Sequence, residues 1–98
     1  MSSGVSRTVQ GSFVGTGLAL AIAKVGFKPR ALLFFNEDDP VFGLHIQGMA
    51  DASAAKQKGS ATTYVTSNGV MLTNTGFSIG ADTDLNVDGE RTWFVAWE

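Results

Sequence analysis

The chain has 98 residues, the length of a single domain, and a formal net charge of −2 with acidic and basic residues intermixed. It therefore lacks the basic surface that a nucleic acid or an anionic membrane would require, and we expect neither as a partner. It has no cysteine, which excludes disulfides, thiol catalysis and cysteine-ligated zinc, and its 12 glycines among many Thr, Val and Phe residues favour short strands joined by tight turns.

The N-terminal part predicts a flexible arm at about residues 1–10, ahead of one β-sandwich domain that spans residues 1–98. A first strand is expected at residues 8–14. A second is expected at residues 18–23, where leucine and isoleucine alternate with alanine. This aliphatic run is shorter than the 7–15 residues of a secretory signal, so we interpret it as a buried strand in a soluble protein made in the cytoplasm.

Two further strands are expected at residues 30–35 and 41–47, separated by an acidic turn that ends at Pro40. In the second of these, Phe42, Leu44 and Ile46 share one face, which we predict to be the core face. His45, the only histidine, would then point outward as an ordinary polar residue. The alanine-rich segment 49–58 predicts at most one short helical turn or a covering loop.

The C-terminal part predicts a strand at residues 61–66 and a hairpin turn at Asn68-Gly69. Short strands follow at residues 69–72, 77–79 and 91–97. The sequence ends one residue after the last strand, and an apolar terminal strand frays unless it pairs inside a sheet. Together these elements predict an all-β fold, a small β-sandwich or barrel of seven to eight short antiparallel strands.

Two strands are apolar on both faces, at residues 31–35 and 93–97. A sandwich strand normally alternates between core and solvent residues. Either a loop, such as residues 48–60, covers the second face within the subunit, or a neighbouring subunit does. We favour the neighbouring subunit and expect a homo-oligomer, with a trimer as one option. The residues assigned to this assembly interface are Phe34, Trp93, Phe94 and Trp97.

Few residue patterns indicate chemistry. Asp84, Asn86 and Asp88 before Gly89 match the first half of a calcium loop, but the position that should hold a bidentate glutamate is Val95. We interpret these residues as turn formers and keep calcium as an alternative. The acids at residues 37–39 are interpreted as a solvated turn, and no G-x-S-x-G elbow occurs. We therefore assign no catalytic residue, cofactor or metal and expect no enzyme.

Six segments in order resemble small structural proteins of tailed-bacteriophage virions. They are GSFxGxG (11–17), GFKPRAxxxFN (26–36), GMAD (48–51), SNGV (67–70), GFSIGxDxDLN (76–86) and ExxxFVAW (90–97). Each segment is a turn with a strand, and their ordered series, which covers nearly the whole chain, carries the resemblance.

The resemblance implies a β-sandwich module in the virion, made in the host bacterial cytoplasm, with no catalytic residues to carry over. Because the chain has no shaft, coiled coil or collagen-like repeat, we expect a capsid decoration or cement protein whose partner is the major capsid protein or another virion protein. The alternative is a receptor- or glycan-binding module of a tail fibre or other tail appendage. That role would use Trp93, Trp97 and Tyr64 as an aromatic platform.

Overall fold

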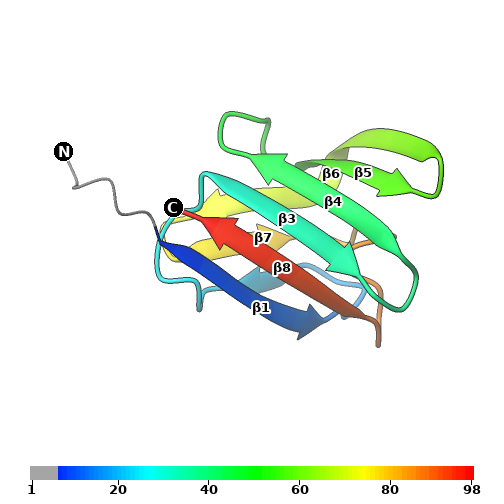
Figure 1. Ribbon diagram of the computed structural model, residues 1–98, viewed down its shortest axis with the longest axis horizontal. Coiled ribbons are helices and arrows are strands. Elements are labelled where there is room, and N and C mark those ends of the chain that lie inside the picture. Colours follow the sequence, from blue (N-terminus) through cyan, green and yellow to red (C-terminus); the bar gives the residue numbers. More distant parts are fainter. Residues whose placement is uncertain (1–6) are drawn as a thin grey trace.

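The computed structural model describes residues 7–98, which form eight strands and contain no helix. The strands are β1 (Thr8–Val14), β2 (Leu20–Ile22), β3 (Ala31–Asn36), β4 (Val41–Ile46), β5 (Ser53–Lys58), β6 (Ala61–Thr73), β7 (Gly76–Ile79) and β8 (Arg91–Trp97). They form one antiparallel sheet in the order β1-β8-β3-β4-β5-β6-β7-β2 (Figure 1). The all-β prediction is confirmed. The search for membrane-spanning helices over these residues finds none.

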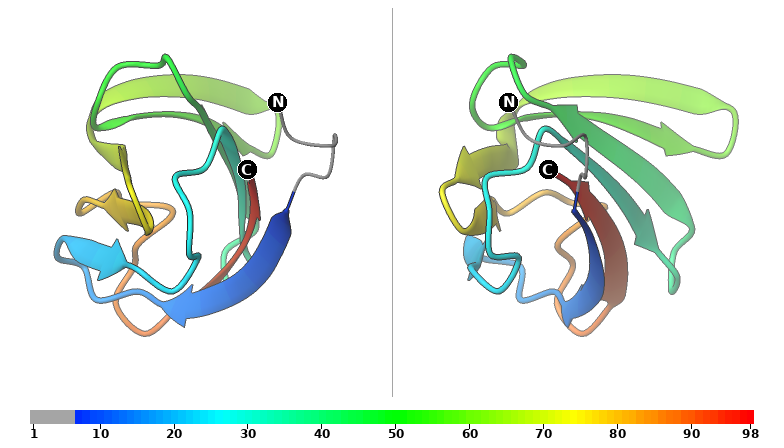
Figure 2. Two further views of the ribbon diagram at one scale, coloured as in Figure 1. Left: turned by 90° about the vertical axis from the view of Figure 1, so that its left-hand side faces the viewer. Right: turned by 60° about the vertical axis from the view of Figure 1, so that its left-hand side comes forward.

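The sheet curls into a half-barrel because its longest strand changes partner midway. The first part of β6 pairs with β5 and the last part with β7, and the register shifts between Ser53 and Ala54. At this bend Asn68 has a φ of 59°. A Cβ on Gly69 would lie 2.6 Å from the carbonyl carbon of Ser53, so only glycine fits there. The bend brings β7 and β2 across from β8 and β3 (Figure 2).

The core fills the space inside this curl. Four phenylalanines meet there, one each from β1, β3, β7 and β8. The ring of Phe77 lies 5.4 Å from that of Phe34 and 5.2 Å from that of Phe94, in edge-to-face arrangements that aromatic rings favour. Phe13 completes the group at 6.3 Å from Phe77. These contacts join the two opposing parts of the sheet.

The predicted orientation of β4 is wrong, because Val41, Gly43 and His45 face the core and Phe42 and Ile46 are exposed. Leu85 from the β7–β8 loop packs onto Gly43, where a Cβ would lie 2.5 Å from the leucine Cδ1. The inner position opposite Leu85 must therefore be a glycine. With Gly43 fixed inward, strand alternation places Val41 and His45 inward as well. His45 is buried, with its Nδ1 2.8 Å from the carbonyl oxygen of Ser53.

Two further predictions for the middle of the chain are wrong. Residues 53–58 form β5 in place of a helical turn or covering loop, and this strand lies inside the sheet between β4 and β6. Asn68-Gly69 lies within β6 and is no hairpin turn. The hairpins close at Gly59-Ser60 and at Asn74-Thr75.

The predicted N-terminal arm overlaps β1, because Thr8 to Gln10 pair with β8. The rest of that prediction, residues 1–6, lies outside the described residues. β8 itself lies between β1 and β3, as expected for an apolar strand that must pair on both sides.

Candidate assembly face

The outer surface of three adjacent strands consists entirely of apolar side chains. In β3 and β8 the residues of even number face the core, and in β4 those of odd number do, so the others point outward. We call these nine outward residues the apolar grid. They are Ala31, Leu33 and Phe35 on β3, Phe42, Leu44 and Ile46 on β4, and Trp93, Val95 and Trp97 on β8. These strands lie side by side in Figure 1, with β7 behind them.

Strand register arranges the apolar grid in three rows. The first row is Trp93, Phe35 and Phe42, the second is Val95, Leu33 and Leu44, and the third is Trp97, Ala31 and Ile46. Five of the nine side chains are exposed, with Phe42 at 53% and Trp93 at 47%. Within residues 7–98 no loop covers them, because residues 53–58, part of the segment predicted as a cover, form a strand of the sheet between β4 and β6.

The apolar grid has a polar border on β1 and a partly polar one on β5, where Ala55 lies opposite Leu44. Thr8, Gln10 and Ser12 of β1 lie opposite Trp97, Val95 and Trp93. Gln57 of β5 lies opposite Phe42. A shallow apolar depression lies between β3 and β8 within the apolar grid. It is lined by Leu33, Phe34, Phe35, Trp93, Phe94 and Val95. An apolar area with a polar rim and a hollow is typical of a protein-binding surface.

The first row of the apolar grid is held in place by its neighbours. The indole nitrogen of Trp93 donates a hydrogen bond to Glu37, and the guanidinium of Arg91 lies 5.9 Å from the centre of the indole ring. The rings of Phe35 and Phe42 are 4.9 Å apart. Side chains that are already ordered lose less conformational entropy when a partner binds.

The structure divides the four predicted interface residues into two pairs. Trp93 and Trp97 belong to the apolar grid, but Phe34 and Phe94 are 0% and 2% exposed inside the core of the same chain. The prediction that Phe34 and Phe94 belong to the interface is therefore wrong, because both side chains lie in the core. Sequence reasoning missed Leu33, Phe42 and Ile46. The signal for Leu33 was present, because it alternates with Leu32 and Phe34 in a strand that is apolar on both faces.

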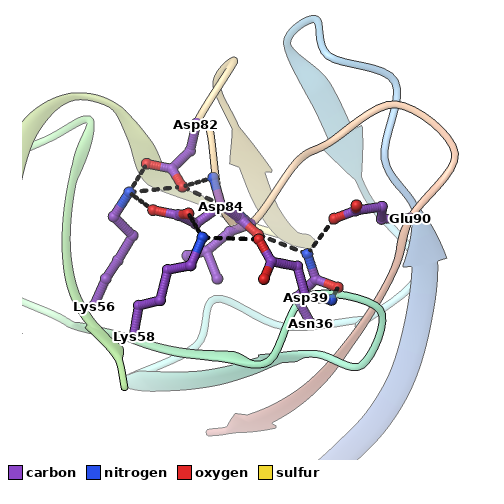
Figure 3. A network of polar contacts seen from close by, with 8 residues as sticks. Asn36, Asp39, Lys56, Lys58, Asp82, Asp84 and Glu90 are labelled. Carbon is purple, nitrogen blue, oxygen red and sulfur yellow. Dashed lines mark hydrogen bonds and ion pairs between the residues drawn. The ribbon is translucent and has the colours of Figure 1, made fainter. Parts of the chain in front are cut away.

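A second cluster, polar and inside the curl, joins β5 to the β7–β8 loop (Figure 3). The Nζ atom of Lys56 donates hydrogen bonds to Asp82 at 2.9 Å and to Asp84 at 2.7 Å. Asp82 Oδ2 also accepts from the backbone NH groups of Asp84 and Leu85, which fixes the loop. Lys58 reaches Asp39 at 2.8 Å and Asp84 at 3.6 Å. Figure 3 shows the two lysines converging on this loop.

The ion pairs shift the pKa values of their members. Burial lowers the pKa of Lys56, but its hydrogen bonds to Asp84 and Asp82 outweigh that effect and raise the pKa above its ordinary value. The hydrogen bond from Lys56 lowers the pKa of Asp84, against the opposing effect of burial. Both shifts favour the charged pair.

These shifts predict the acid sensitivity of the fold. A lowered pKa in the folded state makes Asp84 stabilising above its ordinary pKa of 3.8, and this stability is lost as pH falls through the lowered value. We expect the free energy of unfolding, measured by urea denaturation, to decrease as the pH is lowered below about 4. Asp84→Asn should reduce the slope of the unfolding free energy against pH in this range. Asp88→Asn, at an exposed carboxylate of the same loop, should keep the wild-type slope. Equal slopes in all three proteins would contradict the prediction.

The residues of the calcium alternative have other partners. Asp84 pairs with the two lysines. The side-chain oxygen of Asn86 accepts from the backbone NH of Thr16, and its amide group donates to the carbonyl oxygens of Leu18 and Gly80. Asp88 is exposed. Within residues 7–98, no three His, Asp or Glu side chains gather closely enough to hold a metal ion. Gly89, which follows them, has a φ of 81°, the positive value expected of a turn glycine.

The three adjacent acids of the β3–β4 turn also have separate partners. Glu37 accepts from Trp93, Asp38 accepts from the backbone NH of Arg91, and Asp39 pairs with Lys58. The turn itself is closed by Asn36, whose side-chain oxygen accepts from the backbone NH groups of Asp38 and Asp39. Each carboxylate thus supports the local structure of the turn.

The comparisons with known proteins give no relative: no family model, no curated protein and no solved structure matches this chain.

Proposed function

We propose that this protein is a non-enzymatic structural component of a bacteriophage virion, a capsid decoration protein that assembles through the apolar grid. The observation that carries the proposal is the exposed apolar grid itself, nine outward apolar residues on three paired strands that no described segment covers. Water-exposed apolar surface of this extent favours association with another protein surface.

The virion setting has a different support, the ordered series of six segments that resembles phage structural proteins. The polar groups described above agree with a structural role, because His45, Lys56 and Asp82 are buried and each has a protein partner. An oligomer formed through the apolar grid would present several identical contact sites to a capsid lattice. Weak contacts then suffice, because one binding event makes the next intramolecular.

The proposal is tested by co-sedimentation of the purified protein with undecorated capsids of the phage that encodes it. We expect saturable binding at a fixed ratio to the major capsid protein. The control is the same titration with tail structures from that phage. Binding to tails and none to capsids would reject decoration.

A second candidate function is receptor or glycan binding by a tail appendage. Trp93, Trp97 and Tyr64 are exposed in the isolated chain, which is what an aromatic platform for a sugar ring requires. The two candidates differ in what covers the tryptophans. Acrylamide quenching of tryptophan fluorescence in the assembled protein should be weak if the apolar grid is an interface. Strong quenching together with adsorption of the protein to host cells would favour the platform.

A further inference from the structure

We infer that the apolar grid binds a second copy of this chain, face to face, in a dimer whose two-fold axis runs across the strands. The inference deepens the proposed function and rests on it in one respect, the use of the apolar grid for assembly. It adds the identity of the partner and the geometry of the contact.

The extent of the apolar grid suits a protein partner of this size. Large aromatic side chains offer about 150–250 Å² each, and three of the five exposed members are aromatic. With each of the five only 37–53% exposed, together they present roughly 400 Å² of apolar surface. That is close to the largest patch an ordinary monomer leaves open. A standard interface covers about 800 Å² per partner, with an apolar centre and a polar rim. The apolar grid and its Thr8, Gln10 and Gln57 borders supply both parts.

Two symmetric arrangements place one apolar grid on another. A two-fold axis along the strands stacks each row on the same row of the partner. Phe35 then meets Phe35, and Ala31 meets Ala31, which gives a clash at one end and a gap at the other. A two-fold axis across the strands stacks the first row on the third, so that Phe35 meets Ala31 on the central strand β3, while Trp93 meets Trp97 and Phe42 meets Ile46 on the flanking strands. Interfaces pack as densely as protein interiors, and large-on-small contacts achieve this.

The apolar depression supports the same arrangement. It opens between β3 and β8 beside Trp93, at the first and second rows. With the axis across the strands, the partner's third row approaches this area and brings the partner's Trp97 toward the hollow. In the free chain Trp97 is exposed at the opposite end of β8. Each chain would thus contribute one projecting tryptophan and one hollow.

The charges at the two ends of the apolar grid are complementary under the same symmetry. The end next to the first row carries Glu37, Asp38 and Asp39, an acidic excess that Arg91 and Lys58, the ion-pair partner of Asp39, reduce but do not cancel. The end next to the third row carries exposed Lys28 and Arg30. An axis across the strands places acidic ends on basic ends twice, whereas an axis along the strands places like charges together. Such complementarity fixes orientation and steers association.

The absence of cysteine from the sequence allows a direct test of the symmetry by disulfide trapping. Single variants Ala31→Cys and Phe35→Cys are oxidised separately and as an equimolar mixture. We expect a cross-linked dimer only in the mixture, because a disulfide requires Cα atoms within about 7 Å. Leu33→Cys, in the central row, should cross-link with itself and serves as the positive control. Cross-linking of each single variant alone would overturn the proposed axis.

Sedimentation velocity of the full chain tests the interface itself. We expect a dimer with a dissociation constant in the micromolar range or below. Leu33→Lys places two lysines together at the axis and should raise that constant at least about 30-fold, as loss of an interface hot spot does. Leu18→Lys is the matched control, because Leu18 is 72% exposed and lies outside the apolar grid. It should leave the dimer unchanged. Both variants must keep the wild-type circular dichroism spectrum and melting temperature.

The outcomes separate this inference from the proposed function. A monomer at micromolar concentrations, a trimer, or a dimer that resists Leu33→Lys would each overturn the inference. A monomer that still co-sediments with capsids would leave the proposed function standing without the dimer. A dimer of the expected geometry that binds no capsid would support the interface and reject decoration.

Discussion

Lys56→Met is expected to lower the free energy of unfolding by about 3–5 kcal/mol, the typical effect of removing one partner from a buried ion pair. The side chain of Lys56 is 6% exposed, and those of Asp82 and Asp84 are 3% and 20% exposed. Methionine fills a similar volume but leaves two carboxylates close together with no cation between them. Urea denaturation at pH 7, monitored by tryptophan fluorescence, measures the difference.

Lys58→Met is the matched control for this prediction. Lys58 lies two residues along the same strand and also contacts Asp84, but its side chain is 53% exposed. Water screens such a pair, so we expect a much smaller loss than for Lys56→Met. Equal losses in the two variants would show that burial of the Lys56 pairs does not determine their contribution.

Much of the strand layout could be predicted from local pattern. The bounds of β1 and β8 were predicted correctly, and period-2 alternation placed Phe94 and Ala96 on the same face of β8. Alternation did not indicate that this face is the inner one, and Phe94 was assigned to the interface for that reason. The face of β4 could not be predicted this way, because both of its faces look plausible in sequence. The contact that decides between them, Leu85 on Gly43, joins residues far apart in the chain.

The Asn68-Gly69 pair shows how tertiary pairing overrides a local signal. The dipeptide favours positive φ, and Asn68 does adopt it. The chain uses that conformation to bend β6, because β5 and β7 both pair with β6 on either side of the bend. Sequence alone indicated the positive φ of Asn68 correctly, but Gly69 does not share it, and the predicted role as a hairpin turn was wrong.

The candidate site could be predicted only in part for a similar reason. Two tryptophans in a strand that is apolar on both faces indicated an exposed apolar surface. Its full extent depends on the strand order β8-β3-β4, which no local pattern encodes. Phe42 joins the surface only once β4 is placed beside β3 with Gly43 inward. The polar cluster was missed because Lys56 and Asp82 meet only after β5 and the β7–β8 loop are in place.

Phe77→Ala is expected to lower the free energy of unfolding by about 3–5 kcal/mol through lost burial and the cavity left behind. Phe77 is 1% exposed, and its ring contacts those of Phe13, Phe34 and Phe94 from three other strands. It therefore joins β7 to the opposite wall of the half-barrel, and the three rings around it are themselves buried. Urea denaturation of the Leu33→Lys protein, in which assembly makes no contribution, is the suitable measurement.

The matched control is Phe42→Ala in the same background. Both substitutions remove the same atoms, but the Phe42 side chain is 53% exposed on the apolar grid. We expect a loss of about 1 kcal/mol or less there, because little buried area disappears within the single chain. In the protein without Leu33→Lys, the same Phe42→Ala change should weaken the dimer. A large loss of monomer stability at Phe42 together with a small one at Phe77 would mean that the core lies on the other face of the sheet. The same six ring carbons thus stabilise the fold at Phe77, whereas at Phe42 they face outward and would act in the proposed assembly, so the direction of each strand face decides the role.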